Sequence, residues 1–80
     1  MLVPAQIRAA RALLGLSQGQ LADLAGIGVR TVKRIELADE LSGAARTNWK
    51  IQTALEAAGI EFISAEGGRG PGVRLRTSSL

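Results

Sequence analysis

At the start of the chain, hydrophobic positions recur at the spacing of a helix. Ile7, Ala10 and Leu14 fall on one face, at intervals of three and four residues. Pro4 suits the first turn, where its missing N–H costs no hydrogen bond, and Gly15 is suited to the left-handed conformation that ends a helix. The pattern therefore predicts a first helix from Pro4 to Gly15.

A second helical pattern follows at once. Ser17 and Gln20 form a capping box, in which the hydroxyl accepts an N–H of the first turn and the amide reaches back to the cap. The helix that they open has three apolar residues on one face: Leu21, Ala22 and Ala25. Gly26 is placed to close this helix in the left-handed conformation.

Only two residues separate Gly26 from a third helical pattern, which runs from Val29 to Leu37. Val32 and Ile35 of this pattern point inward. Its outward face carries three basic residues: Arg30, Lys33 and Arg34. Two short helices joined by so tight a turn must cross steeply, because the chain cannot double back. This geometry is the helix-turn-helix.

The pattern after the third helix is less regular and predicts a short helical turn around Leu41 to Ala45. Thr47 or Asn48 is expected to cap a stronger helix that ends at Gly59. The apolar stripe of that helix consists of Ile51, Ala54, Leu55 and Ala58. Trp49 is expected in the core, because no neighbouring aromatic residues suggest a stacking platform for single-stranded nucleic acid.

After Gly59 the hydrophobic period changes from helical to alternating. Ile60–Ile63 and Val73–Arg76 are predicted strands, joined by glycine-rich residues 67–72. No Gly-Lys-Ser/Thr element accompanies the glycines, so we expect a hairpin loop and not a phosphate-binding loop. The sequence therefore predicts a mainly α domain of four to five helices with a C-terminal β-hairpin. Its parts are a helical domain over residues 1–59, a hairpin over 60–76 and a flexible tail over 77–80.

The composition excludes several classes of protein. The chain of 80 residues has no Cys and no His, which removes disulfides, thiol chemistry and the usual zinc ligands. No paired carboxylates stand at a suitable spacing, so we expect no enzyme, no cofactor and no metal. No stretch approaches the roughly 20 apolar residues of a membrane helix, and the N-terminus lacks the basic lead of a secretory signal. A soluble cytoplasmic protein is expected.

The charge of the chain favours an anionic partner. Its formal net charge is +3, and a basic balance is typical of proteins that bind nucleic acid. The position of the charges is more informative than their sum. Besides the basic residues of the third helix, a second cluster near the C-terminus consists of Arg69, Arg74 and Arg76. These arginines either reach a DNA backbone or keep a strand soluble, and the sequence leaves both roles open.

Residues 17–36 read SQGQLADLAGIGVRTVKRIE, and this segment closely resembles the helix-turn-helix of the lambda repressor and Cro superfamily, the XRE family. The matching residues are Ser17, Gln18, Leu21, Ala22, Gly26, Ile27, Val32, Ile35 and Glu36. The likeness extends to residues 7–11 and to residues 54–59, and the Gly-Val-Arg-Leu-Arg ending resembles that of many short bacterial members. The resemblance implies a lambda repressor-like fold and binding to double-stranded DNA.

A protruding second helix fits the major groove of DNA, which is about 12 Å wide. An arginine there can donate two hydrogen bonds to guanine, and a valine can pack on a thymine methyl. The resemblance implies that the bases are contacted by Val29, Arg30 and Arg34. Gln18 matches a residue that binds phosphate and braces the recognition helix, residues 29–36. Thr31 and Lys33 match positions beside the DNA backbone, where contacts give affinity and register.

The resemblance also implies roles inside the protein. Arg11 and Glu36 match an ion pair between the first helix and the recognition helix. The sequence leaves open whether Arg8 contacts phosphate or only water. Two features depart from the family: Gly28 stands where a Ser or Thr commonly caps the recognition helix, and residues 37–40 place acidic charge where a short glycine-containing turn is usual.

One such domain reads only about half a turn of duplex, and the family solution is a twofold dimer on half-sites roughly 34 Å apart. A two-stranded ribbon leaves open edges that a second copy can cover. We therefore expect the hairpin to form a dimer contact, through Ile60, Phe62, Val73 and Leu75. The sequence predicts a transcriptional regulator that binds a palindromic operator as a homodimer, of a type found in bacteria and phages.

Two other functions compete with this one. An antitoxin-like or adaptor protein would use the same fold mainly to bind another protein, such as a toxin or a polymerase subunit. Its outward face over residues 29–34 would tend to be apolar or acidic, whereas here it is basic and polar. An architectural protein would bind any duplex with similar affinity at fixed salt.

Overall fold

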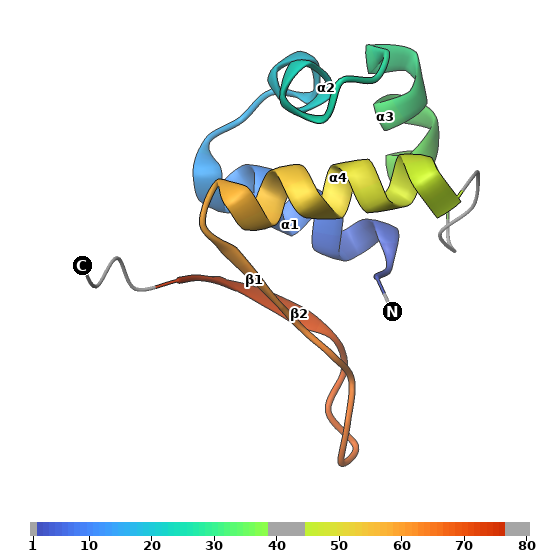
Figure 1. The fold of residues 1–80 in the computed structure, drawn as a ribbon. Coiled ribbons are helices and arrows are strands. Elements are labelled where there is room, and N and C mark those ends of the chain that lie inside the picture. Colours follow the sequence, from blue (N-terminus) through green and yellow to red (C-terminus); the bar gives the residue numbers. More distant parts are fainter. Residues whose placement is uncertain (1, 39–44, 77–80) are drawn as a thin grey trace.

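The computed structural model describes residues 2–38 and 45–76. They form four helices followed by an antiparallel two-stranded hairpin (Figure 1), with the bounds α1 Pro4–Leu14, α2 Gln18–Ala25, α3 Val29–Leu37, α4 Ala45–Ala57, β1 Ile60–Ile63 and β2 Gly72–Leu75. This architecture confirms the predicted mainly α fold with a C-terminal β-hairpin. Most of the short turn expected around Leu41, and the tail over residues 77–80, lie outside the described residues.

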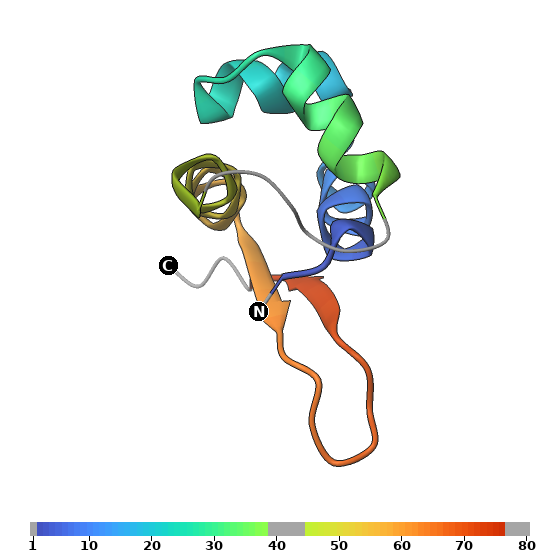
Figure 2. The same ribbon diagram turned by 90° about the vertical axis from the view of Figure 1, so that its right-hand side faces the viewer.

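The elements lie in three layers. Figures 1 and 2 show α2 and α3 on one side of the α1 and α4 layer, and the hairpin on the other side. Helix α1 packs against α3 and β2, whereas α4 packs against α2 and β1. The loop between the strands extends away from the helices. The recognition helix α3 and the hairpin therefore lie on opposite sides of the molecule.

The ends of α1 and α2 are fixed by local hydrogen bonds and glycine. Ser17 Oγ accepts the Gln20 N–H at 3.0 Å, and Gln20 Oε1 accepts the Ser17 N–H at 2.8 Å, as the capping box predicts. Gly15 and Gly26 close their helices with φ of 69° and 70°. This left-handed conformation costs other residues roughly 1–2 kcal/mol. The two tight turns therefore set the orientation of α2 relative to α1 and of α3 relative to α2.

The core is built from aliphatic side chains of all four helices and β1. Its fully buried members include Ile7, Leu21, Val32, Ile35, Ile51, Leu55 and Ile60. Truncation of one such Leu or Ile to Ala typically costs about 2–5 kcal/mol. The same cluster that stabilises the fold therefore holds α3 in place through two of its own residues, Val32 and Ile35.

Two predictions for α4 are wrong. The helix begins at Ala45, so Thr47 and Asn48 lie inside its first turns and not at its cap. Trp49 is 63% exposed and lies outside the core. Ile51 is fully buried, and a residue two positions earlier lies on roughly the opposite face of a helix with 3.6 residues per turn. The apolar stripe and not the size of the indole decides which side chain is buried.

The hairpin agrees with its prediction to within one residue. Strand β2 begins and ends one residue earlier than expected, and Phe62 pairs with Val73 while Ile60 pairs with Leu75. Arg76 extends the ladder, because its N–H donates to the carbonyl oxygen of Gly59 at 2.7 Å. Ile60 and Phe62 lie on the same face as their partners, and that face is turned toward the helices.

Gln6 fastens the hairpin to α1. Its side chain is 3% exposed, and Nε2 donates to the carbonyl oxygens of Ile63 at 3.1 Å and Gly72 at 2.9 Å. Oε1 accepts the Val3 N–H at 2.9 Å, which caps the helix. The sequence assigned no role to Gln6, because a polar residue in a first turn looks the same whether or not a hairpin covers it.

Candidate nucleic-acid interface

The outward face of α3 carries three exposed basic side chains. Arg30, Lys33 and Arg34 are exposed, and no hydrogen bond or ion pair joins their side chains to any residue within 2–38 or 45–76. Val29, at the start of the same helix, is 40% exposed, and Thr31 is half-buried. The face proposed from the sequence is therefore accessible.

The opposite face of α3 fixes its rotation. Val32 and Ile35 are 0% and 1% exposed, and residues three apart lie on the same side of a helix. Gly28 caps the helix with extended backbone, and its carbonyl oxygen accepts the N–H groups of Thr31 and Val32. No side chain caps the N-terminus of α3. The first turn, where the base-contacting residues are expected, is thus uncovered while the rest of the helix is held.

The carboxylate of Glu36 anchors the C-terminal half of α3. It is 3% exposed, and Arg11 of α1 donates to both of its oxygens, from Nε to Oε2 at 2.7 Å and from Nη2 to Oε1 at 2.8 Å. The ion pair that the resemblance implied is therefore present. The hydrogen bonds to Glu36 raise the pKa of Arg11, so the guanidinium stays protonated. This pair ties the recognition helix to α1.

Two further side chains converge on Glu36. Gln18, at the start of α2, donates Nε2 to Glu36 Oε1 at 3.1 Å. Arg8 donates Nη1 to the main-chain carbonyl of Glu36, in the last turn of α3, where carbonyls lack helical partners. Neither role that the sequence left open for Arg8 included this contact. The signal was its spacing from Arg11, because residues three apart on α1 face the same neighbour.

Gln18 is expected both to brace the recognition helix and to contact phosphate, and the structure shows the first of these contacts. Its amide braces the recognition helix through Glu36, while contact with phosphate stays a prediction. Its place at the N-terminus of α2 suits that prediction, because free N–H groups and the helix dipole favour an anion there. Thr31 and Lys33 likewise lie on α3 beside the residues expected to reach the bases.

Two of the three arginines of the hairpin, in contrast, are engaged inside the protein through their side chains. Arg74 Nη2 lies 2.6 Å from Glu61 Oε2, and this hydrogen bond lowers the pKa of Glu61 and raises that of Arg74. Arg76 donates Nη2 to the carbonyl oxygen of Glu56, near the C-terminal end of α4. Arg69 lies in the loop between the strands, across an isolated bridge from Glu66. The hairpin lies on the far side of α1 and α4 from α3 (Figures 1 and 2).

The four apolar residues expected at a dimer contact are used partly within the monomer. Ile60 is 1% exposed and belongs to the core. Phe62 and Val73 are half-buried and pack against that core, whereas Leu75 is 50% exposed. The shared face of the two strands therefore covers α1 and α4. A contact with a second copy has to use what this face leaves exposed, or the edges of the strands.

Three further kinds of feature are relevant to function: metal sites, membrane-spanning helices and apolar grooves. Within residues 2–38 and 45–76, no three acidic residues gather as candidate metal ligands. In the same part of the chain, no helix is both long enough and apolar enough to cross a membrane. Leu24 of α2 and Trp49 of α4 are 57% and 63% exposed, and they line a shallow groove of about 320 Å³.

Comparison with known proteins identifies the central part of the chain. Residues 7–43 match a protein-family model described as helix-turn-helix. The matched segment spans most of α1 and all of α2 and α3, which include the basic face and the contacts around Glu36. No curated protein matches the sequence.

Proposed function

Residues 7–43 form a helix-turn-helix of the lambda repressor/Cro-like (XRE) family of DNA-binding regulators, and from this premise we propose that the chain is a sequence-specific transcriptional regulator. Helix α3 enters the major groove of an operator. Val29, Arg30 and Arg34 contact base edges, and Gln18, Thr31 and Lys33 contact the DNA backbone. The protein acts in the cytoplasm, on nucleoid DNA.

One observation carries this proposal: α3 is anchored on one side and free on the other. Its inner residues are buried in the core, and Glu36 is held by three other side chains. Its basic residues have no partner among the described residues. A rigid helix with free guanidinium donors can present them to a groove without losing contacts inside the protein. Preorganisation of this kind reduces the entropy cost of binding.

The regulator binds as a homodimer to a palindromic operator. A single α3 contacts few base pairs, and twofold symmetry doubles the number that are read. Of the four hairpin residues expected at the contact, Ile60 is buried in the core, so self-association uses Leu75 and the exposed parts of Phe62 and Val73. Because the hairpin and α3 are on opposite sides of the α1 and α4 layer (Figure 1), contact through the hairpin leaves α3 accessible.

The test is selection of bound sites from a pool of random duplexes by the purified parent protein. We expect enrichment of one motif with inverted half-sites whose centres lie about one helical turn apart. Footprinting on the selected site then locates the protected bases. Enrichment of no motif, together with equal affinity for all duplexes at fixed salt, would contradict sequence-specific binding and favour an architectural protein.

A second candidate function, binding of another protein by an antitoxin-like or adaptor chain, is supported by one separate observation. Leu24 and Trp49 expose large apolar surfaces along the groove between α2 and α4, and exposed aromatic side chains are frequent at interfaces. Trp49→Ala distinguishes the two functions. It leaves operator affinity unchanged if DNA is the partner, and a loss of regulation in cells with intact DNA binding identifies a protein partner.

A further inference from the structure

The groove between α2 and α4, of about 320 Å³, has apolar walls. Leu24 of α2 and Trp49 of α4 line it, and both side chains are more than half exposed. Its deeper lining consists of small side chains, with Ala25 in the core and Ala54 packed against the core. Because alanine leaves room at the bottom, a large apolar side chain of a partner can enter between the leucine and the indole.

The indole of Trp49 stays at the surface for a structural reason. The buried stripe of α4 runs through Ile51 and Leu55, and Trp49 lies outside this stripe, so the core of its own chain cannot cover it. Tryptophan is among the residues most enriched at binding hot spots, since it buries a large apolar area with only two side-chain torsions to fix. A second molecule is therefore needed to remove this ring from water.

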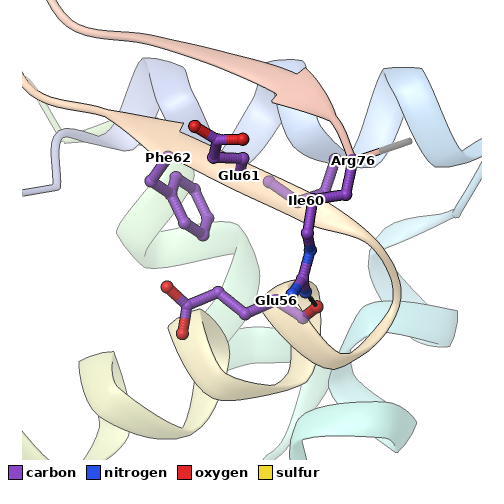
Figure 3. Close-up of a pocket in the computed structure, with 5 residues that line it drawn as sticks. All are labelled: Glu56, Ile60, Glu61, Phe62 and Arg76. Atoms are coloured by element: carbon purple, nitrogen blue, oxygen red, sulfur yellow. Dashed lines mark hydrogen bonds between the residues drawn. The ribbon is translucent and has the colours of Figure 1, made fainter. Parts of the chain in front are cut away.

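A larger hollow on the other side of α4 is of a different kind. It measures about 400 Å³ and lies between α4 and β1 (Figure 3), and charged residues contribute much of its lining. These groups already have partners inside the chain. Arg76 donates to the carbonyl oxygen of Glu56, as Figure 3 shows, and Glu61 is paired with Arg74. A ligand there has few free polar groups to meet, so the groove beside α2 is the stronger candidate.

The charge of the groove comes from Lys50. Its side chain is half-buried and lines the groove, and it has no hydrogen bond or ion pair with any residue within 2–38 or 45–76. Among the described residues, those that line the groove include no Asp or Glu. Arg46, exposed and one turn earlier, lies on the same face of α4. A carboxylate beside the apolar side chains of a partner would complement this charge.

The shape of the groove suits a helix. Trp49, Thr53 and Ala57 line it at intervals of four residues, so it follows α4 for about 12 Å at 1.5 Å per residue. An amphipathic helix presents apolar side chains at i, i+4 and i+7, over about 10 Å. An extended peptide would need main-chain partners, and the main chains of α2 and α4 are bonded within their own helices. A helix satisfies its own main chain.

We propose that this groove binds an acidic amphipathic helix of another protein. One apolar side chain of that helix enters between Leu24 and Trp49, and a carboxylate lies beside Lys50. The proposal goes beyond the proposed function, because the groove takes no part in reading DNA.

The groove and the recognition helix lie on different sides of the molecule. Helix α3 packs against α1, whereas α4 packs against α2. Figure 2 shows α4 on one side, and α1 with α3 above it on the other. A partner in the groove therefore leaves α3 accessible. Unlike an adaptor that binds a protein in place of DNA, this chain holds its partner while it is bound to an operator.

Selection from a displayed library of helical peptides, randomised along one face, identifies the chemistry that the groove prefers. We expect enriched peptides to share apolar residues at helical spacing with an Asp or Glu beside them. Selection against Lys50→Glu should enrich basic residues at that position instead, because the charge of the site is reversed. Enrichment of no peptide by the parent, or the same peptides from the parent and Lys50→Glu, would overturn the proposal.

The fluorescence of Trp49 shows directly whether the groove is filled, because the chain has one Trp. Titration with an enriched peptide that lacks Trp should shift the emission to shorter wavelength and saturate, as the indole leaves water. The operator alone, or a change in protein concentration alone, should not shift it. A shift with operator would assign the groove to DNA, and a shift with concentration would assign it to a second copy. Either result overturns the proposal.

Matched variants measure the contribution of each side chain to the affinity for the labelled peptide. In fluorescence anisotropy, Trp49→Ala should weaken binding about 30-fold and Lys50→Ala about 5-fold. Leu13→Ala is the control for Leu24→Ala, because Leu13 is also an exposed leucine but lies on α1, outside the groove. Circular dichroism verifies that each variant folds. Equal affinities of Leu13→Ala and Leu24→Ala would contradict the assignment.

DNA binding separates this proposal from the proposed function. The parent saturated with peptide should bind the selected operator with unchanged affinity, and competition between peptide and operator would contradict separate surfaces. A parent that binds the acidic peptide but no duplex would contradict the proposed function and leave the groove assignment intact. A parent that reads an operator but enriches no peptide would contradict the groove assignment alone.

Discussion

Helix α3 and the hairpin both carry arginines, but they use them differently. In the hairpin, Arg74 pairs with Glu61 and Arg76 donates to the carbonyl oxygen of Glu56. On α3, Arg30 and Arg34 have no such partner among the described residues. The total charge of the chain cannot show this difference. A basic cluster indicates a binding surface only where its donors are free. Within residues 2–38 and 45–76, the cluster on α3 is the one in which no side chain has a partner.

The contrast also runs within α3. Its first half is free, and its last turn is held by Arg11, Gln18 and Arg8 through one residue, Glu36. The held end gives the free end its orientation. The predictions below test first the held end, then the free one, and then the hairpin.

The largest effect is expected from Glu36→Ala. The change removes the partner of Arg11, which is only 21% exposed, and it leaves the amide of Gln18 without an acceptor. Loss of one member of such a buried pair costs about 3 kcal/mol. Urea unfolding measures the change, with Glu61→Ala in the exposed hairpin pair as the control. Equal losses in the two variants would show that Glu36 is no anchor.

The next effect is expected at the free face. Arg30→Ala and Arg34→Ala should each weaken operator binding by about 1–3 kcal/mol, which is roughly 5- to 150-fold, and relax the base preference. Fluorescence anisotropy with the selected operator measures this. Arg74→Ala is the matched control, because that arginine is engaged with Glu61, and it should bind as the parent does. If all three variants bind alike, α3 is not the reading helix.

An effect of similar size, on stability and not on binding, is expected where the hairpin joins α1. Gln6→Ala removes the donor that reaches two carbonyl oxygens, and a buried polar group left unsatisfied costs about 1–3 kcal/mol. Gln6→Glu keeps an acceptor for the Val3 N–H but places negative charge against the carbonyls, so it should be less stable still. Thermal unfolding ranks the three proteins. Equal stability of Gln6→Glu and the parent would contradict the fastening role.

The smallest effect is the pH dependence of the Arg74–Glu61 pair. Arg74 lowers the pKa of Glu61 below its ordinary value of 4.5, so the unfolded chain binds more protons between the two values and stability rises with pH there. The contribution is complete above 4.5 and is lost as the pH falls through the lowered pKa. The difference in unfolding free energy between the parent and Arg74→Ala should therefore vanish in acid. A difference that persists there would be due to packing.

The sequence predicted what local pattern determines. The helix-turn-helix and its outward face follow from the apolar period and from the glycines at its turns, and the pair of Arg11 with Glu36 follows from the family likeness. It missed what depends on elements distant in the chain. Gln6 and Arg8 have their partners at Gly72 and Glu36, far along the sequence. No local pattern shows that such residues meet.

The wrong predictions have a physical reason of the same kind. Trp49 is expected in the core because no neighbouring aromatic residues suggest a stacking platform, but its position relative to the buried stripe of α4 turns it outward. Ile60 is expected at an interface as a strand residue, but it is 1% exposed and belongs to the core of its own chain. Only the packing of the layers shows that Trp49 is exposed and that Ile60 is covered by its own chain.

The central claim is that free guanidinium groups on an anchored α3 read DNA sequence. The direct test is the ratio of the dissociation constants for the selected operator and for a scrambled duplex at one salt concentration. The parent should prefer the operator by about 10³-fold or more, the double variant Arg30→Ala/Arg34→Ala should lose most of this preference, and Arg74→Ala/Arg76→Ala should keep it. A parent that binds both duplexes equally, or a preference that follows the hairpin arginines, would contradict the claim.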